Sequence, residues 1–344
     1  MKKHLSVLLI VVLLASFLCA CGNSTQPSDS PNPSAAPASE VKVRTFTVAT
    51  GGSSQSSPIG VGADEFAKKL EEYSGGTLRA DVYYDTQLGS TQDLVDGIQQ
   101  GTVDFTEAGN SFFSAYVPEL QAIELPFLFD SYDQARSILQ GAAGEYVKAK
   151  FEGTGIKILA FWEIGFRHMT NNDHAIHSIE DVNGLKIRTL PAAVQVAAWE
   201  TFGAVPTPID FSELYTSLQQ GVVSGQENPL SEIYSKKFYE IQKYITLTGH
   251  VYTPGPFACS EATWNSLTEQ EQEWVMMAVE DATAAMFSAN DALETNALSE
   301  MEAYGCEIDR DPDVTGFQEK AETVYSIFTD QYGTEFLDLI IASK

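Results

Sequence analysis

The segment between residues 41 and 106 alternates strand-like and helix-like stretches, and this order is the strongest constraint on the fold. Val41–Thr50 alternates apolar and polar residues as a strand does, and Thr77–Tyr84 and Val103–Thr106 are two further short strands. Helical patterns lie between them, one over Ile59–Tyr73 and one that ends at Gly101. This β-α-β-α-β order predicts an α/β fold with parallel strands and helices on both faces of the sheet.

The rest of the chain continues this alternation. Strands are expected at Ile156–Trp162, Phe166–Thr170, Leu185–Arg188, within Tyr239–Thr248, at Phe257–Ser260 and at Cys306–Ile308, and helices at Ala192–Phe202, Val314–Thr329 and Thr334–Ala342. A helical run from Thr268 to about Tyr304 is longer than one globular domain usually needs. We expect this run to cross from one domain to another.

The stretch Pro206–Leu230 combines turn residues, a helix and polar groups. Ser212 is expected to cap a helix that Gly221 ends, and Val222–Val223 is expected to be a short strand. That strand would deliver three polar residues to a turn closed by a proline, namely Gln226, Glu227 and Asn228 before Pro229. Polar groups at the carboxyl end of a strand suit a ligand crevice.

The composition limits the partners of this chain. Its 344 residues carry a formal net charge of -27, which disfavours nucleic acid and anionic lipid surfaces. Salt screens such a net field within roughly 10 Å, so a few local arginines can still bind a small anion.

The N-terminus is typical of an exported protein. Lys2 and Lys3 precede an apolar stretch, Leu5–Leu18, that is too short for a convincing membrane span. Residues 1–21 therefore predict a signal peptide whose end resembles a bacterial lipobox, with Cys21 as the lipid-modified residue. An ordinary signal cut nearby is the alternative. Residues 22–42 are rich in Ser, Pro and Ala and predict a flexible tether, so we expect a lipid anchor on the outer face of a bacterial membrane.

Two cysteines remain in the folded part, Cys259 and Cys306. A disulfide between them is permitted outside the cell, and two separate buried thiols are the alternative. Their separation in sequence does not decide between the two.

No enzyme signature occurs in the sequence. Dinucleotide-binding, phosphate-loop and nucleophile-elbow motifs are all missing. His174 and His177 lie three residues apart without an evident third ligand, so no metal site and no cofactor are expected. An exported enzyme acting on acidic sugars remains as an alternative class.

The arginines are the best candidates for ligand contacts, because the chain has only six of them. Arg167 and Arg188 each follow a glycine and lie at the end of a short strand pattern. A guanidinium group can hold a carboxylate through two parallel hydrogen bonds, which the ammonium group of lysine cannot do. A structural salt bridge is the alternative role of each.

Many sequence segments, in their order along the chain, resemble the extracytoplasmic solute-binding subunits of TRAP transporters, of the C4-dicarboxylate-binding (DctP-like) type. The resemblance covers nearly all of the chain after the tether. It is carried by Gln87-Leu-Gly, Gly101-Thr-Val-Asp-Phe, Leu125-Pro-Phe-Leu-Phe, Gly165-Phe-Arg-His, Gly184-Leu-Lys-Ile-Arg, Gly203-Ala-Val-Pro-Thr-Pro, Phe211-Ser-Glu-Leu-Tyr and Gly225-Gln-Glu-Asn-Pro-Leu, among others.

The resemblance implies a two-domain periplasmic-binding-protein-like fold with a central cleft and a long domain-spanning helix. Domain I would comprise residues 43–163 and 253–293, and domain II residues 164–252 and 294–344. A ligand would bind in the cleft, and the domains would close over it by a hinge motion.

The resemblance also implies ligand contacts. Arg188 would make the main salt bridge to a ligand carboxylate, Arg167 a second contact, Asn228 would hold an oxygen and Phe211 would form an apolar wall. Glu107, from the other domain, is expected to accept hydroxyl groups of a sugar acid.

Two departures from the family pattern concern the ligand and the structure. Several sialic-acid-binding members carry a ligand-contacting glutamate where this chain has Gly109, and the acid here is Glu107 instead. That argues against sialic acid and leaves a smaller acid or a sugar acid. Ser224 replaces an aspartate of many members, and we expect this change to affect structure more than ligand choice.

By this resemblance the chain is an organic-acid receptor that delivers its ligand to a membrane-embedded, sodium-coupled TRAP permease. A receptor for a signalling partner would have the same binding site and is the alternative that the sequence leaves open. A binding protein of the ABC type fits the motifs poorly.

Overall fold

The computed structural model describes residues 42–344. The predicted signal peptide, the predicted acylation site Cys21 and nearly all of the predicted tether lie outside the described residues. The strands are β1 (Arg44–Thr50), β2 (Leu78–Tyr83), β3 (Phe105–Glu107), β4 (Ile156–Asn171), β5 (Lys186–Thr189), β6 (Val205–Pro208), β7 (Gly225–Pro229), β8 (Tyr244–Ser260) and β9 (Glu307–Asp309).

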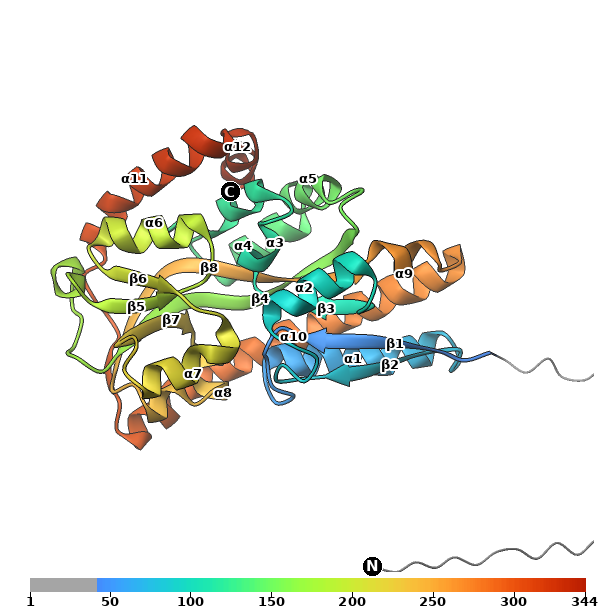
Figure 1. Cartoon of the computed structure of the whole chain (residues 1–344), viewed down its shortest axis with the longest axis horizontal. Coiled ribbons are helices and arrows are strands. Elements are labelled where there is room, and N and C mark those ends of the chain that lie inside the picture. The colour runs from blue at the N-terminus through green and yellow to red at the C-terminus, as the bar shows by residue number, and fades with distance from the viewer. Residues whose placement is uncertain (1–41) are drawn as a thin grey trace, which may run out of the picture. The chain divides into compact units, whose positions relative to one another are not determined.

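Helices cover both faces of the sheet that these strands form (Figure 1). The α-helices are α1 (Pro58–Tyr73), α2 (Thr91–Gln100), α3 (Asn110–Phe113), α4 (Tyr132–Gln140), α5 (Ala142–Lys150), α6 (Ala193–Phe202), α7 (Phe211–Gln219), α8 (Leu230–Ser235), α9 (Glu261–Asn265), α10 (Glu269–Tyr304), α11 (Thr315–Tyr332) and α12 (Glu335–Ala342). Three short 3-10 helices complete the described elements, over Pro118–Glu124, Ile179–Val182 and Phe238–Glu240.

The sheet is mixed, with the strand order β2-β1-β3-β8-β4-β7-β5-β6 and with β9 paired to β8. Strand β1 pairs in parallel with both β2 and β3, which confirms the parallel β-α-β-α-β opening predicted from the sequence. Strand β5 likewise pairs in parallel with β6 and β7. The antiparallel pairs β3–β8, β4–β8 and β4–β7 join these two parallel regions.

Strands β4 and β8 are longer than the sequence pattern predicts. We expected two strands in each region, but each forms one continuous strand, because the two pair with each other along nearly their whole length. Their ladder shifts register at three places, one of them between Glu163 and Gly165. Gly165 has a φ of 126°, a backbone conformation that favours glycine, and this lets the strand continue through the irregularity.

The prediction of a strand at Val222–Val223 is wrong. Val222 is 54% exposed, and its N–H donates to the Ser217 carbonyl in the turn after α7. The strand begins three residues later, so Gln226, Glu227 and Asn228 lie within β7 and not in a turn beyond it. Central strands buried on both faces need no polar and apolar alternation, and polar side chains can occupy them when they hydrogen-bond each other.

The N-cap of helix α7 lies two residues earlier than predicted. Asp210, not Ser212, is its N-cap, and the Asp210 side chain accepts a hydrogen bond from the Ser212 N–H. Pro206 and Pro208 lie in β6, which is an edge strand, where the missing N–H groups of proline are tolerated.

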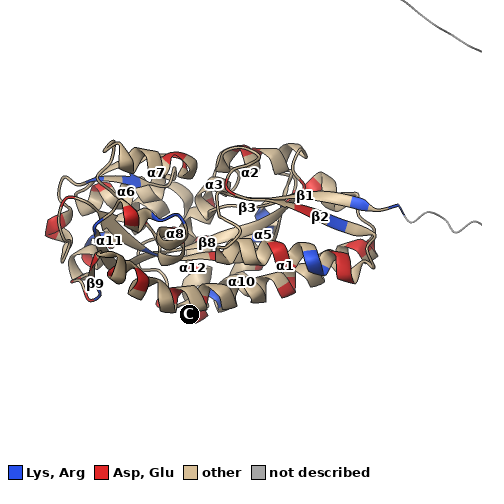
Figure 2. Ribbon diagram, turned by 90° about the horizontal axis from the view of Figure 1, so that it is seen from below, with Lys and Arg blue, Asp and Glu red and all other residues tan. Residues whose placement is uncertain are grey.

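Helix α10 confirms the predicted long helix. Thr268 caps it, forming a reciprocal capping box with Glu271. Its first half packs on α1 within one hydrophobic cluster, whereas Ala297 and Met301 in its second half belong to another cluster with residues of α7 and α8. Figure 2 shows α10 running alongside α1, with several Asp and Glu positions coloured red along both helices.

The two C-terminal helices contact different parts of the molecule. Helix α11 packs on α6, with the rings of Phe317 and Phe202 5.2 Å apart between centroids. Helix α12 packs on α5, where Phe336 stacks on Tyr146 at 5.5 Å. The described residues form one compact unit by their contacts, and the predicted domain boundaries stay a prediction.

Both remaining cysteines are buried and free in this structure. Cys259 lies in the cluster beneath α1 and α10, and Cys306 lies in the cluster near β9, so they belong to different parts of the core. Between residues 42 and 344, no helix combines the length and apolar character that a membrane span requires. The same residues contain no group of three or more potential metal ligands.

Candidate functional site

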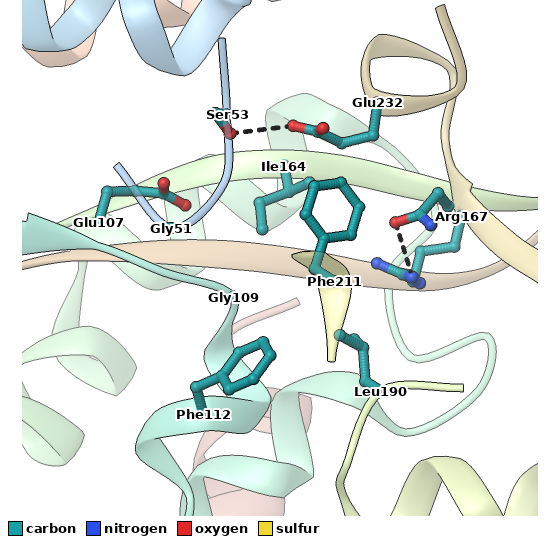
Figure 3. Close-up of a pocket in the computed structure, with 11 residues that line it drawn as sticks. Gly51, Ser53, Glu107, Gly109, Phe112, Ile164, Arg167, Leu190, Phe211 and Glu232 are labelled. Carbon is teal, nitrogen blue, oxygen red and sulfur yellow. Dashed lines mark hydrogen bonds between the residues drawn. The ribbon is translucent and has the colours of Figure 1, made fainter. Parts of the chain in front are cut away.

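A pocket lies where the two parallel regions of the sheet meet the central strands. Its lining combines charged, polar and apolar side chains with two glycines: Gly51, Ser53, Glu107, Gly109, Phe112, Ile164, Arg167, Leu190, Phe211, Asn228 and Glu232. Figure 3 shows Phe211 near the centre of this group, with Glu107 on one side and Arg167 on the other. Four of the five predicted contact residues therefore line one pocket, and the fifth, Arg188, lies beside it.

The lining residues come from distant parts of the sequence. Glu107 is the last residue of β3, Arg167 lies in β4 and Asn228 in β7, while Phe211 begins α7 and Glu232 lies in α8. Strands β3 and β7 are separated in the sheet only by β8 and β4. The pocket thus forms at strand and helix ends, where side chains from several elements can meet around a ligand.

Arg188 is fully buried, and its guanidinium group is only partly bonded. Its Nε donates to the Ile209 carbonyl at 2.9 Å, but Nη1 and Nη2 have no hydrogen-bond partner among the described residues. Its Cζ lies 5.8 Å from the centroid of the Phe211 ring, which places it next to the pocket. Burial, together with the nearby positive charge of Arg167, lowers the pKa of Arg188 to about 10. A buried cation with two free donor groups fits an anionic ligand.

Arg167 already has an anionic partner within the protein. It forms a buried ion pair with Glu227, in which Nη2 donates to Oε1 at 2.9 Å. The same Nη2 also donates to Asn228 Oδ1 at 3.0 Å. Arg167 therefore fixes the orientation of the Asn228 amide, and the salt bridge that sequence analysis gave as its alternative role is present.

Glu227 is held in its charged form. Burial works to raise its pKa, but the charge of Arg167 and hydrogen bonds from His250 and Arg167 outweigh burial and lower the pKa to about 2. His250 Nε2 lies 3.3 Å from Glu227 Oε2. The Arg167–Glu227 pair is thus close to neutral overall, so it leaves Arg188 as the less compensated cation near the pocket.

Two further carboxyl groups line the pocket, and neither has a strong cationic partner. Burial and then the negative charge of Glu232 raise the pKa of Glu107 to about 8. Burial also raises the pKa of Glu232, although Lys236 and a hydrogen bond from Ser53 oppose this effect. Ser53 Oγ donates to Glu232 Oε1 at 3.1 Å, whereas Glu232 Oε2 has no partner among the described residues.

Phe211 forms part of an apolar wall and contacts the loop that follows β1. A Cβ atom at Gly52 would lie 2.7 Å from Phe211 Cδ1, so only glycine allows this close approach. The Phe211 ring also meets the Phe238 ring edge-on at 6.0 Å. Phe112, Ile164 and Leu190 complete the apolar lining.

Sequence reasoning missed several lining residues. Glu232 lies three residues after the Gln-Glu-Asn-Pro segment, but an acid in the first turn of a helix is common and gives no signal by itself. Ser53 lies in the Gly/Ser loop after β1, whereas Phe112, Ile164 and Leu190 look like ordinary core residues in the sequence. Only the folded arrangement distinguishes them.

The mixed α/β fold, the long helix and a charged pocket between strand ends define a solute-binding protein of the periplasmic type. The family model described as bacterial extracellular solute-binding protein, family 7 (DctP), matches residues 50–331. The chain belongs to this family, which comprises the extracytoplasmic solute-binding proteins of TRAP transporters. Its members are transport receptors and not enzymes, and they work outside the cytoplasm.

Known relatives match most of the chain. The 2,3-diketo-L-gulonate-binding periplasmic protein of Escherichia coli is 31% identical over 288 residues, which cover 84% of this chain and 84% of the relative. A crystal structure of a TRAP periplasmic solute-binding protein from Polaromonas, bound to D-erythronate, superposes with a TM-score of 0.84 at 33% identity and covers 86% of this chain and 97% of that one. A Bordetella homologue whose ligand density is assigned to pantoate gives 0.83 at 34% identity, covering 87% and 99%.

Proposed function

We propose that this protein is the extracytoplasmic receptor of a TRAP transporter and binds an organic acid through arginine–carboxylate contacts. The observation that carries the proposal is the Arg188 guanidinium, which is fully buried beside the pocket with two unbonded donor groups. Hydrogen bonds to a charged group contribute about 1.5–3 kcal/mol each. A ligand carboxylate would satisfy both donor groups and compensate the buried charge.

The other predicted contacts support the same ligand chemistry. Asn228 offers an amide beside Arg167, and Phe211 offers an apolar surface next to the Arg188 group. The ligands named for the similar structures, D-erythronate and pantoate, are both hydroxylated carboxylic acids. The ligand class proposed for this chain is accordingly a small organic acid, either a C4-dicarboxylate or a sugar acid.

Delivery to a membrane-embedded permease needs no chemical step in the receptor. A ligand that contacts both sides of the pocket binds the closed state more tightly than the open state and so shifts the population toward closure. The closed receptor would then present its ligand to the permease subunits.

We also propose that acylation at Cys21 anchors the receptor to the outer face of the cytoplasmic membrane. The support is the signal-like N-terminus with its lipobox-like end, followed by a polar tether. Growth with labelled palmitate should label the native protein, and the Cys21→Ser variant should lose the label. Label that stays on the variant would contradict the anchor site.

A ligand screen tests the receptor function. Dicarboxylates, aldonates, uronates and keto acids at millimolar concentration are compared by thermal shift, and hits are titrated by calorimetry. A ligand present at a thousand times its dissociation constant stabilises the folded state by about 4 kcal/mol. A best ligand that lacks a carboxylate would contradict the arginine contact.

A further inference from the structure

Glu107 and Glu232 place two acid groups in one buried pocket. Glu107 ends β3, and Glu232 lies in α8 after β7, so they reach the pocket from different parts of the sheet. The exposed fractions of the two residues are only 2% and 4%. Each therefore has little solvent to stabilise its charge, and the negative charge of Glu232 contributes to the raised pKa of Glu107.

The hydrogen bonding of Glu232 is incomplete. Ser53 satisfies Oε1, but Oε2 is buried without a partner among residues 42–344. An ionised carboxylate only accepts hydrogen bonds, so the missing partner must be a donor. A hydroxyl group of a ligand is such a donor, whereas a ligand carboxylate is not.

Arg188 lies toward another part of the pocket from Glu107, whereas the charges of Lys236 and Arg167 both act on Glu232. In the sheet, β8, β4 and β7 separate the Glu107 strand from the Arg188 strand. The charged groups that shift the pKa of Arg188 are Arg167, Glu227 and Asp210, and neither Glu107 nor Glu232 is among them. A ligand whose carboxylate binds at Arg188 would therefore direct its other end toward the two acids.

We infer that Glu107 and Glu232 make the pocket specific for an acid with one carboxylate and a hydroxylated far end, and that they exclude a second carboxylate. This inference rests on the proposed receptor function and narrows its ligand class to hydroxy monocarboxylates such as aldonates. Burial and the charge of Glu232 already oppose ionisation of Glu107, so a ligand carboxylate at the same desolvated place would meet the same like-charge repulsion, which costs several kcal/mol.

Matched pairs of acids test this specificity without any variant. Erythronate is compared with meso-tartrate, and galactonate with galactarate, by calorimetry at pH 7. Within each pair only the terminal CH2OH group is replaced by a carboxylate. The aldonate is expected to bind more tightly than its diacid by at least about tenfold. A diacid that binds as tightly as its aldonate overturns the inference, while the receptor function stands.

Two isosteric variants, Glu107→Gln and Glu232→Gln, identify the residues responsible. Glu232→Gln is expected to reduce the preference for galactonate over galactarate by about tenfold or more at pH 7, and Glu107→Gln is expected to do so at pH 9, where the native Glu107 carboxyl group is ionised. Glu294→Gln, which changes a carboxyl group outside this pocket, is the matched control and should leave the preference unchanged. A preference that stays the same in both folded pocket variants would contradict the assignment.

A third probe pair separates hydroxyl recognition from cation recognition. An acid pair could also hold an ammonium group, so 4-aminobutyrate is compared with 4-hydroxybutyrate. Tighter binding of 4-aminobutyrate would overturn the inference in favour of a zwitterionic ligand. If no acid of any series binds, the proposed function itself fails and the inference fails with it.

Discussion

The Cζ atom of Arg188 lies 5.8 Å from the centroid of the Phe211 ring, and both Nη groups of this arginine are buried without a hydrogen-bond partner among the described residues. Arg167, by contrast, lies in a complete ion pair with Glu227. The two arginines that appear equivalent in the sequence thus have different local environments. This difference makes their substitution effects distinguishable.

Replacing Arg188 should weaken ligand binding without weakening the fold. Arg188→Met removes a buried charge that lacks a carboxylate partner, so the free energy of unfolding without ligand should stay the same or rise. Ligand affinity should fall by about 1.5–3 kcal/mol or more, because the charged hydrogen bonds are lost. Urea unfolding and calorimetry measure the two effects.

Arg310→Met, in an exposed ion pair, is the control and should change neither the free energy of unfolding nor the ligand affinity. An Arg188→Lys variant with native affinity would refute bidentate binding.

Replacing Glu227 should instead weaken the fold. Glu227→Gln leaves the buried Arg167 without its counter-charge, and breaking a buried pair in this way costs about 3–5 kcal/mol. Urea unfolding of the ligand-free protein measures this loss. Glu302→Gln, which removes the acid of the exposed Arg310 pair, should have almost no effect. Equal stability of the two variants would show that the Arg167–Glu227 pair is not essential to the fold.

Glu107 should make stability fall as the pH rises. Burial and the charge of Glu232 raise its pKa from the ordinary 4.5 to about 8 in the folded protein. The folded state therefore binds more protons than the unfolded state between these values. The contribution of Glu107 to the free energy of unfolding is fully present below about pH 4.5 and is lost as the pH rises through 8. It amounts to a few kcal/mol in order of magnitude, about what a pKa shift of this size gives.

The Glu107→Gln variant tests this pH dependence. Its free energy of unfolding should fall less between pH 5 and pH 8 than that of the native protein, as measured by urea unfolding at each pH. Parallel pH profiles for the two proteins would contradict the assigned protonation of Glu107.

Gly165 should not tolerate a side chain. Its φ of 126° is strained for other residues, and a Cβ atom would lie 2.8 Å from the Tyr132 hydroxyl and 3.2 Å from Pro229 Cβ. Gly165→Ala should therefore destabilise the protein by about 1–3 kcal/mol or more. Gly184→Ala, with φ of 76° but no atom within 4 Å, is the control for the backbone effect alone. Equal losses would show that the steric contacts at Gly165 relax without cost.

The two buried cysteines should behave as separate thiols. Cys259 and Cys306 are free in the structure and lie in different hydrophobic clusters. Alkylation followed by peptide mapping should modify both only after unfolding, with no reducing agent needed. A disulfide-linked peptide containing both residues would contradict this result.

Much of the fold follows from local patterns that the sequence shows directly. The helix of residues 269–304 has a capping threonine and a long apolar repeat, so its start and length were predicted correctly. The strands around residues 44–107 alternate with clear helices, and their parallel pairing follows from that order. Such features depend on neighbours in the sequence and not on distant contacts.

The errors occur where distant contacts decide the structure. Val222 and Val223 have strand propensity, but the neighbouring strands β4 and β5 pair with the polar segment three residues later. Glu227 pairs in register with Met169 there, and its charge is compensated by an arginine 60 residues away in the sequence. Neither the pairing partner nor this compensation is visible in a local pattern, since tertiary contacts override β-propensity.

In the candidate site, too, some residues were predictable from the sequence and others were not. Arg188, Arg167, Asn228 and Phe211 were predicted from family motifs, and the structure brings them together at or beside one pocket. Their roles toward a ligand stay predictions. Glu232 could not be predicted, because its role depends on the distance between α8 and the end of β3 in the folded protein.

The placement of the last two helices has a mechanical consequence. Helix α11 is fixed to α6 and helix α12 to α5, and only Gly333 and Thr334 connect the two helices. Any movement that separates α5 from α6 must stretch this short connection or detach one helix from its partner. In the proposed opening of the cleft, this connection of fixed length would therefore limit how far the two sides of the molecule can separate.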